Sequence, residues 1–182
     1  MKLFRSFAIV FICLLALPGA HARDITEQRR AEVDLNAQQS LEALFAQRGN
    51  ARELYDQSVG YAVFTATKAG FVVSGGRGTG VVVSKEDGSR TYMRMFTGGV
   101  GFGIGAQTYD LVLLFQTQSR LNQFLGGSWD ASTSAHAAAG TDGVGVASTF
   151  VDGVAVYQLT ETGLMAWADV SGTRFRVLDT QE

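Results

Sequence analysis

Cysteine and histidine are nearly absent from this sequence. Its 182 residues contain one cysteine, Cys13, and two histidines, His21 and His136. Cys13 and His21 both lie within the first 22 residues, which have the pattern of a cleavable leader. The chain without that leader keeps no cysteine and one histidine, which excludes disulfides, thiolate chemistry and metal sites built from cysteine and histidine.

The sequence also lacks an excess of positive charge. Loss of Lys2 and Arg5 with the leader lowers the number of lysines and arginines from 15 to 13, against 17 aspartates and glutamates, so the net charge becomes −4. A chain with this charge has no general basic field that would attract nucleic acid. Any attraction to an anionic surface would have to be local.

The first 22 residues have the three parts of a secretory signal peptide. Lys2 and Arg5 precede the apolar run Phe7–Leu17, and Ala20-His21-Ala22 is a small-x-small cleavage site. An apolar run of about 11 residues is too short to span a bilayer, which argues against a membrane anchor. We predict cleavage after Ala22 and a periplasmic or secreted protein, free or peripheral on a membrane.

Residues 23–50 are predicted to form an amphipathic helix. Apolar residues recur at helical spacing in an otherwise polar segment, at Ala37, Leu41, Leu44 and Phe45. Such a stripe favours packing on the domain core. The alternative is a helix on a membrane surface, with Arg29 and Arg30 near the headgroups. Asn50 with Glu53 matches a capping box and predicts a second, short helix over Ala51–Gln57.

Strand patterns prevail after residue 59. Strands are expected over Gly60–Phe64, Gly70–Ser74, Thr79–Ser84, Arg90–Phe96, Val151–Leu159, Leu164–Val170 and Thr173–Leu178, the last three as a meander, with two more within Ala131–Ala147. Glycine-rich turns separate the first three strands, and Lys85–Gly88 supplies a hairpin turn. One later helix begins after Thr117 and stops at Gly126-Gly127. These patterns predict an α+β fold, in which N-terminal helices precede a mostly antiparallel, curled or barrel-like sheet with one additional helix.

The stretch Gly98–Gln116 is the most regular of the chain. Glycines at 99, 101, 103 and 105 alternate with apolar residues, which is the period of a strand with one bare face. The continuous apolar run Leu111–Phe115 indicates a strand that is covered on both faces. We expect this glycine-rich stretch to organise the sheet, with another backbone, a ring or a ligand close to its bare face.

Nucleotide-binding loops are not supported by the glycine motifs. Gly75–Gly80 lacks the lysine and the helix of a P-loop, because Val81–Val83 continues as a strand. Gly101–Gly105 lacks the GxGxxG spacing and the helix that would hold a pyrophosphate.

Catalytic groups are not supported either. His136 could act as a base for Ser132, Thr133 or Ser134 only if it lay across from one of them, because adjacent strand positions point apart. The aspartates that could form a carboxylate pair are each expected at strand ends or turns, where local hydrogen bonding explains them: Asp110, Asp130, Asp142, Asp152 and Asp169. No EF-hand spacing marks a cation site. We predict no catalytic residue, no metal and no cofactor.

Several ordered segments together resemble the SYLF family of lipid-binding domains, over about residues 51–180. They are Ala51–Leu54 with Gly60–Phe64, Lys68–Phe71 with Gly75–Gly80, Gly101–Gln107 with Asp110–Leu114, and Gly163-Leu164. Each motif alone is weak, and their order and spacing carry the resemblance.

The resemblance implies a binding module without catalysis. Eukaryotic members of the SYLF family bind phosphoinositides through basic residues, helped by an amphipathic N-terminal helix, and some bind actin filaments. Bacterial members are exported proteins of the cell envelope. The resemblance carries lipid contact to Lys68 and Arg77, which lie in shared motifs, and more loosely to Arg29 and Arg30 of the preceding helix. Actin is not an expected partner of an exported chain.

Two main functional hypotheses follow, beside a third possibility, a small hydrophobic ligand held in the curled sheet. The first is an exported, non-catalytic module that contacts anionic phospholipid through a phosphoinositide-like headgroup site at Lys68, Arg77, Arg29 and Arg30. The alternative is a structural or protein-interaction component of the bacterial cell envelope without a lipid ligand, in which the glycine face accepts a partner strand or self-associates.

Overall fold

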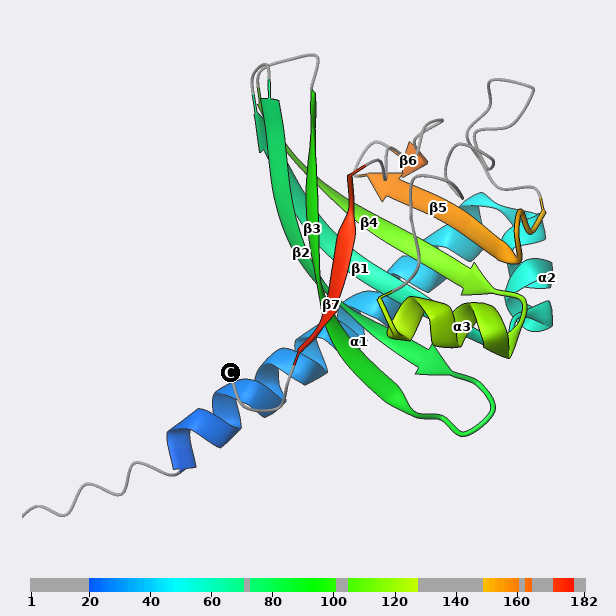
Figure 1. Ribbon diagram of the computed structural model, residues 1–182, viewed down its shortest axis with the longest axis horizontal. Helices are drawn as coiled ribbons and strands as arrows, with labels where there is room; N and C mark the ends of the chain where they lie inside the picture. The colour runs from blue at the N-terminus through cyan, green and yellow to red at the C-terminus, as the bar shows by residue number, and fades with distance from the viewer. Residues whose placement is uncertain are drawn as a thin grey trace, which may run out of the picture.

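Three helices and one seven-stranded antiparallel sheet form the described part of the chain (Figure 1). The computed structural model describes residues 20–70, 73–100, 105–127, 149–160, 163–164 and 172–178. The helices are α1 (Ala20–Gln47), α2 (Gly49–Gln57) and α3 (Gln118–Leu125). The strands are β1 (Gly60–Gly70), β2 (Val73–Ser84), β3 (Arg90–Val100), β4 (Gly105–Phe115), β5 (Val154–Thr160), β6 (Gly163–Leu164) and β7 (Arg174–Val177).

The sheet is curled and open. Its strand order is β6-β5-β4-β1-β2-β3-β7, and no ladder joins β6 to β7 within the described ranges. The predicted α+β class, with helices before an antiparallel sheet and one later helix, is therefore confirmed. β1 lies at the centre, paired with β4 on one side and β2 on the other.

The sheet is covered on both faces. On one face α3 packs an aromatic cluster, in which Phe124 lies 4.8 Å from Phe175 and 5.1 Å from Phe115, measured between ring centroids. On the other face α1 and α2 pack against a second apolar cluster. The apolar run Leu111–Phe115 of β4 lies between these layers and is fully buried, as its continuous hydrophobicity predicts.

Helix α1 packs on the sheet through the apolar stripe that the sequence shows. Ala37 and Leu41 are 5% and 7% exposed and Leu44 is 0% exposed. These side chains share a cluster with Val63 and Val112 of the sheet. The interpretation of this helix as a core helix is therefore confirmed, because its apolar face is already occupied.

The predicted cap of α3 and the predicted hairpin turn after β2 are both confirmed. Thr117 caps α3, and its hydroxyl accepts a hydrogen bond from the backbone nitrogen of Arg120 at 3.4 Å. The turn after β2 contains Gly88 at a φ of +71°.

The predicted capping box is wrong. The residue before α2 is Arg48, which makes no side-chain cap, and Asn50 already lies inside the helix.

The glycine-rich segment Gly75–Gly78, predicted to be a turn between two strands, lies instead within the long strand β2. Its glycines allow close contact with β1. A Cβ on Gly76 would lie 2.7 Å from the carbonyl oxygen of Thr67, and one on Gly78 would lie 2.7 Å from that of Thr65. Glycine is needed here because two strands approach closely, not because the chain turns.

The glycine strand expected in the first half of Gly98–Gln116 is not a single strand. β3 ends at Val100 and β4 begins at Gly105, and these two strands are separated in the sheet by β2 and β1. The period-of-two pattern is the same on either side of a reversal, so it does not show where the chain turns.

The predicted C-terminal meander is confirmed only for the pairing of its first two strands. β5 pairs with β6, whereas β7 pairs with β3 at the opposite edge of the sheet. The two strands expected within Ala131–Ala147, His136 with its neighbouring hydroxyls, and most of Leu164–Val170 lie outside the described residues.

Candidate functional site

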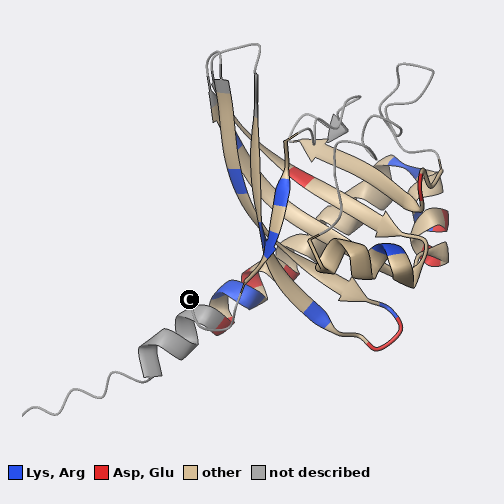
Figure 2. Cartoon of the chain, viewed as in Figure 1, with Lys and Arg blue, Asp and Glu red and all other residues tan. Residues whose placement is uncertain are grey.

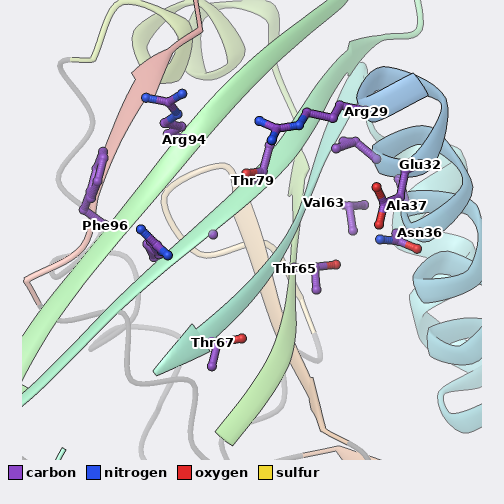
Figure 3. A pocket seen from close by; sticks show the side chains of 13 residues that line it. Arg29, Glu32, Asn36, Ala37, Val63, Thr65, Thr67, Thr79, Arg94 and Phe96 are labelled. Carbon is purple, nitrogen blue, oxygen red and sulfur yellow. The ribbon is translucent and has the colours of Figure 1, made fainter. Parts of the chain in front are cut away.

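An open pocket of about 680 Å³ lies between α1 and the strands β1, β2 and β3. Figure 3 shows Arg29 extending from α1 toward Thr79 of β2, with Arg94 and Phe96 on β3. The pocket is lined by Arg29, Glu32, Val33, Asn36, Ala37, Val63, Thr65, Thr67, Arg77, Gly78, Thr79, Arg94 and Phe96. Its walls therefore combine the guanidinium groups of three arginines with hydroxyls, one exposed aromatic ring and a single carboxylate, that of Glu32.

Strand alternation places these side chains on one face. Successive side chains of a strand point to opposite faces, and paired residues of an antiparallel ladder share a face. Arg77 of β2 is paired with Phe96 of β3, and Thr79 with Arg94. The same face therefore carries both arginines and looks toward α1.

Strand β7 extends this face to the edge of the sheet. Phe96 is paired with Arg174, and Arg94 is paired directly with Arg176. Two rows thus cross β2, β3 and β7. The first is Arg77, Phe96 and Arg174, and the second is Thr79, Arg94 and Arg176. We call these six residues the arginine face.

The strands are basic although the chain as a whole is acidic. The described strands hold six basic residues, Lys68, Arg77, Arg90, Arg94, Arg174 and Arg176, and a single acidic residue, Asp110. Figure 2 shows basic residues on the strands as well as on the helices, whereas most acidic residues lie on the helices and at the β2–β3 turn. The strands therefore carry an excess of positive charge that the net charge of the chain does not show.

Asp110 lies in the middle of β4, not at a strand end as the sequence suggests. Its carboxylate accepts hydrogen bonds from the hydroxyls of Ser40 at 2.9 Å and Thr65 at 2.7 Å. These bonds link α1 to the sheet beside a second, smaller pocket of about 380 Å³. Asp110 therefore has a structural role in holding α1.

A second contact fixes α1 near the basic pocket. Asp34 of α1 accepts a hydrogen bond from Tyr92 at 3.0 Å and forms an ion pair with Arg90 at 2.8 Å. Burial, with the hydrogen bond to Asp34, raises the pKa of Tyr92 above its usual value. The Arg30 guanidinium lies 5.3 Å from the centre of the same tyrosine ring. The wall formed by α1 is therefore held in place by charged groups that lie outside the pocket.

The structure brings together two of the four residues expected to contact lipid. Arg29 and Arg77 line the same pocket. Arg30 contacts Tyr92 beside it. Lys68 is paired with Gly76, and both belong to the opposite face of the sheet.

Sequence reasoning missed the other members of the arginine face. The alternation of Tyr92, Arg94 and Phe96 on one side of a strand is visible in the sequence. The addition of Arg174 and Arg176 is not, because it requires the pairing of β7 with β3.

The site offers anion recognition and shows no sign of a metal centre. Guanidinium groups bind phosphate or carboxylate through several N–H donors at once. Within the described ranges no three metal-ligating residues gather. Over the same ranges, none of the helices has the length and hydrophobicity needed to cross a membrane.

Comparison with known proteins matches residues 96–181 to a family model described as "Ysc84: Las17-binding protein actin regulator". The chain is 32% identical over 149 residues to "Beta cell expansion factor A" of Aeromonas veronii, which covers 82% of this chain and 57% of that protein. It is 31% identical over 137 residues to "LAS seventeen-binding protein 3" of Saccharomyces cerevisiae, covering 66% of this chain and 28% of that protein. The chain therefore spans only part of each relative.

Proposed function

The chain belongs to the Ysc84, or SYLF, family, and from this membership we propose that it is an exported, non-catalytic module that binds anionic phospholipid at a membrane surface. Export rests on the signal-peptide pattern of residues 1–22. Lipid binding rests on the family and on the basic pocket together.

One observation carries the proposal. Arg29, Arg77 and Arg94 come from three different elements and line one pocket, in a chain whose net charge after loss of the leader is −4. Basic residues near an anionic membrane surface each contribute about 1 kcal/mol to binding. Local clustering therefore supplies the attraction that the chain as a whole lacks.

Sedimentation with vesicles tests this function. Residues 23–182 are mixed with phosphatidylcholine vesicles that contain graded amounts of phosphatidylglycerol, at low and at physiological salt. We expect binding that rises with anionic lipid and falls with salt, because exposed charges are screened beyond about 8–10 Å. Absence of binding to every vesicle would overturn the proposal.

Charge reversal locates the contact. The double variant R29E/R77E changes two exposed pocket residues, and we expect its affinity for anionic vesicles to fall at least about tenfold. R52E, on the exposed surface of α2, is the control for a charge reversal away from the pocket and should bind as the unmodified protein does. K68E shows whether the opposite face of the sheet also contributes.

A second candidate function is a protein-interaction role in the cell envelope. The yeast relative is named for binding LAS17, which is a protein partner. Light scattering during size-exclusion chromatography separates the two candidates. A stable oligomer that does not bind vesicles would favour the interaction role.

A further inference from the structure

Large apolar side chains are exposed at three places in the described part of the chain. Leu35 of α1 is 53% exposed, Phe96 of β3 is 42% exposed and Val177 of β7 is 46% exposed. Phe96 and Val177 lie on neighbouring strands at one edge of the sheet, whereas Leu35 lies on the helix. A membrane-binding surface needs such side chains next to positive charge.

Phe96 lies between arginines. It is paired with Arg77 on one side and with Arg174 on the other. In the next row Arg94 is paired directly with Arg176. Like charges directly opposite each other on one face of a sheet are unfavourable. A phosphate group near this edge would lie close to several guanidiniums, so the arrangement fits a surface that meets phosphate.

Both sides of this edge carry an apolar side chain. Arg176 and Val177 are adjacent on β7 and therefore point to opposite faces. Phe96 lies on the face of Arg176, and Val177 is paired with Met93 on the other face. Strand β7 is the last strand of the described sheet on this side. An edge of this kind can enter the headgroup region with apolar contacts on either side.

The stripe of α1 is not available for the same purpose. Ala37, Leu41 and Leu44 are at most 7% exposed because they pack on the sheet. Insertion of this helix into a bilayer would first require its separation from the sheet, which would expose that apolar cluster.

We propose that the β3–β7 edge, with Phe96 among the arginines of the arginine face, is the surface that enters the headgroup layer of an anionic phospholipid bilayer, while α1 stays on the sheet. This inference rests on the proposed function and specifies how the protein is oriented. The occupant follows from charge complementarity, since the edge presents arginines and the described strands hold a single acid, Asp110, which is already bonded to Ser40 and Thr65.

Single-cysteine labelling tests the orientation. Residues 23–182 contain no cysteine, so F96C, V177C and L35C can each carry one environment-sensitive fluorophore. F96C and L35C form a matched pair, because both replace an exposed apolar side chain. Each labelled protein is mixed with phosphatidylcholine–phosphatidylglycerol vesicles, with and without a quencher attached to the lipid chains. Labels at 96 and 177 should shift to the blue and be quenched, and the label at 35 should do neither.

Charge reversal at the edge gives a second measurement. R174E/R176E should lower the affinity for these vesicles at least about tenfold, whereas R52E should not. Inorganic phosphate added at millimolar concentration, with the ionic strength held constant, distinguishes a free anion from a bilayer as the ligand. Displacement of the protein from vesicles by phosphate alone would show a free-anion site and overturn the proposal.

The outcomes separate this inference from the proposed function. If the unmodified protein binds no vesicles, the lipid function itself fails. If it binds but the label at 35 responds as strongly as the label at 96, or none of the labels responds, the edge assignment is wrong and the lipid function stands. Loss of binding in unlabelled F96C with an unchanged circular dichroism spectrum would support the edge.

Discussion

At the scale of single residues, the hydroxyl of Tyr157 lies in the core. The side chain is 0% exposed, and its oxygen makes no hydrogen bond to any residue that the structure describes. An unsatisfied buried polar group costs about 1–3 kcal/mol. We therefore expect Y157F to raise the free energy of unfolding by about 1 kcal/mol at pH 7, measured by urea denaturation. A destabilised Y157F would show that the hydroxyl has a partner in solution.

The same residue predicts a dependence on pH. Burial raises the pKa of Tyr157 to about 12 in the folded protein, and the value in the unfolded chain is about 10. The folded state thus holds the proton more tightly, and the stability from this group is complete below about pH 10 and is lost as the pH rises toward 12. Y157F lacks this loss, so the two proteins should diverge further between pH 9 and about 11. Parallel stability curves would contradict the assignment.

Among the glycines whose surroundings the structure describes, Gly80 leaves the least room for a side chain. A Cβ there would overlap the carbonyl oxygen of Val63 and the ring of Phe64. G80A should therefore cost about 1–3 kcal/mol or more, because neither the backbone nor the packed ring can move away. Gly75 lies in the same strand, and nothing lies within 4 Å of the position that a Cβ would take there. G75A is therefore the control and should change the unfolding free energy by less than about 0.5 kcal/mol.

At the scale of elements, α1 is part of the core rather than an appendage. Leu44 is 0% exposed and Leu35 is 53% exposed on the same helix. L44A should lower the free energy of unfolding by about 2–5 kcal/mol, and L35A should change it by less than about 0.5 kcal/mol. Equal, small effects in urea denaturation would mean that the helix leaves the sheet easily, and the membrane-helix interpretation would return.

Elements with local signals could be predicted from the sequence. The cap at Thr117, the apolar side of α3 and the turn at Gly88 depend on residues within a few positions of one another. The stripe of α1 has a clear helical period. The place of β7 could not be predicted, because its pairing with β3 joins segments about 80 residues apart, and nothing in either strand specifies the partner.

The prediction of a turn in the glycine-rich segment of β2 was wrong for a related reason. Glycine allows both a turn and the close approach of two strands. At Gly78 the second explanation holds, since the added atom would meet Ala66 and Thr65 of β1. The residues of the candidate site could likewise be predicted only in part from the sequence. Arg29 and Arg77 could be proposed from a family resemblance, but Arg174 and Arg176 join the site only through the register of β7.

At the scale of the whole molecule, net charge is a poor guide to the surface. The acidic residues of the described part lie on α1, α2 and turns, with Asp110 as the exception, whereas arginines lie on the strands as well as on the helices. Counting charges over the chain averages these regions and gives −4 after loss of the leader. The separation allows an acidic chain to present one basic face.

Removal of the leader should leave this architecture intact. Cleavage after Ala22 would shorten α1 by its first three residues, Ala20–Ala22, whereas the buried stripe begins at Ala37. We expect the protein exported by a Gram-negative host to begin at Arg23, as read by intact mass and N-terminal sequencing. Its thermal midpoint should match that of residues 23–182 produced directly, because the two chains are then identical. A chain that keeps Met1 and stays in the cytoplasm would overturn export, and the phospholipid met by the arginine face would then have to be that of an inner, cytoplasmic leaflet.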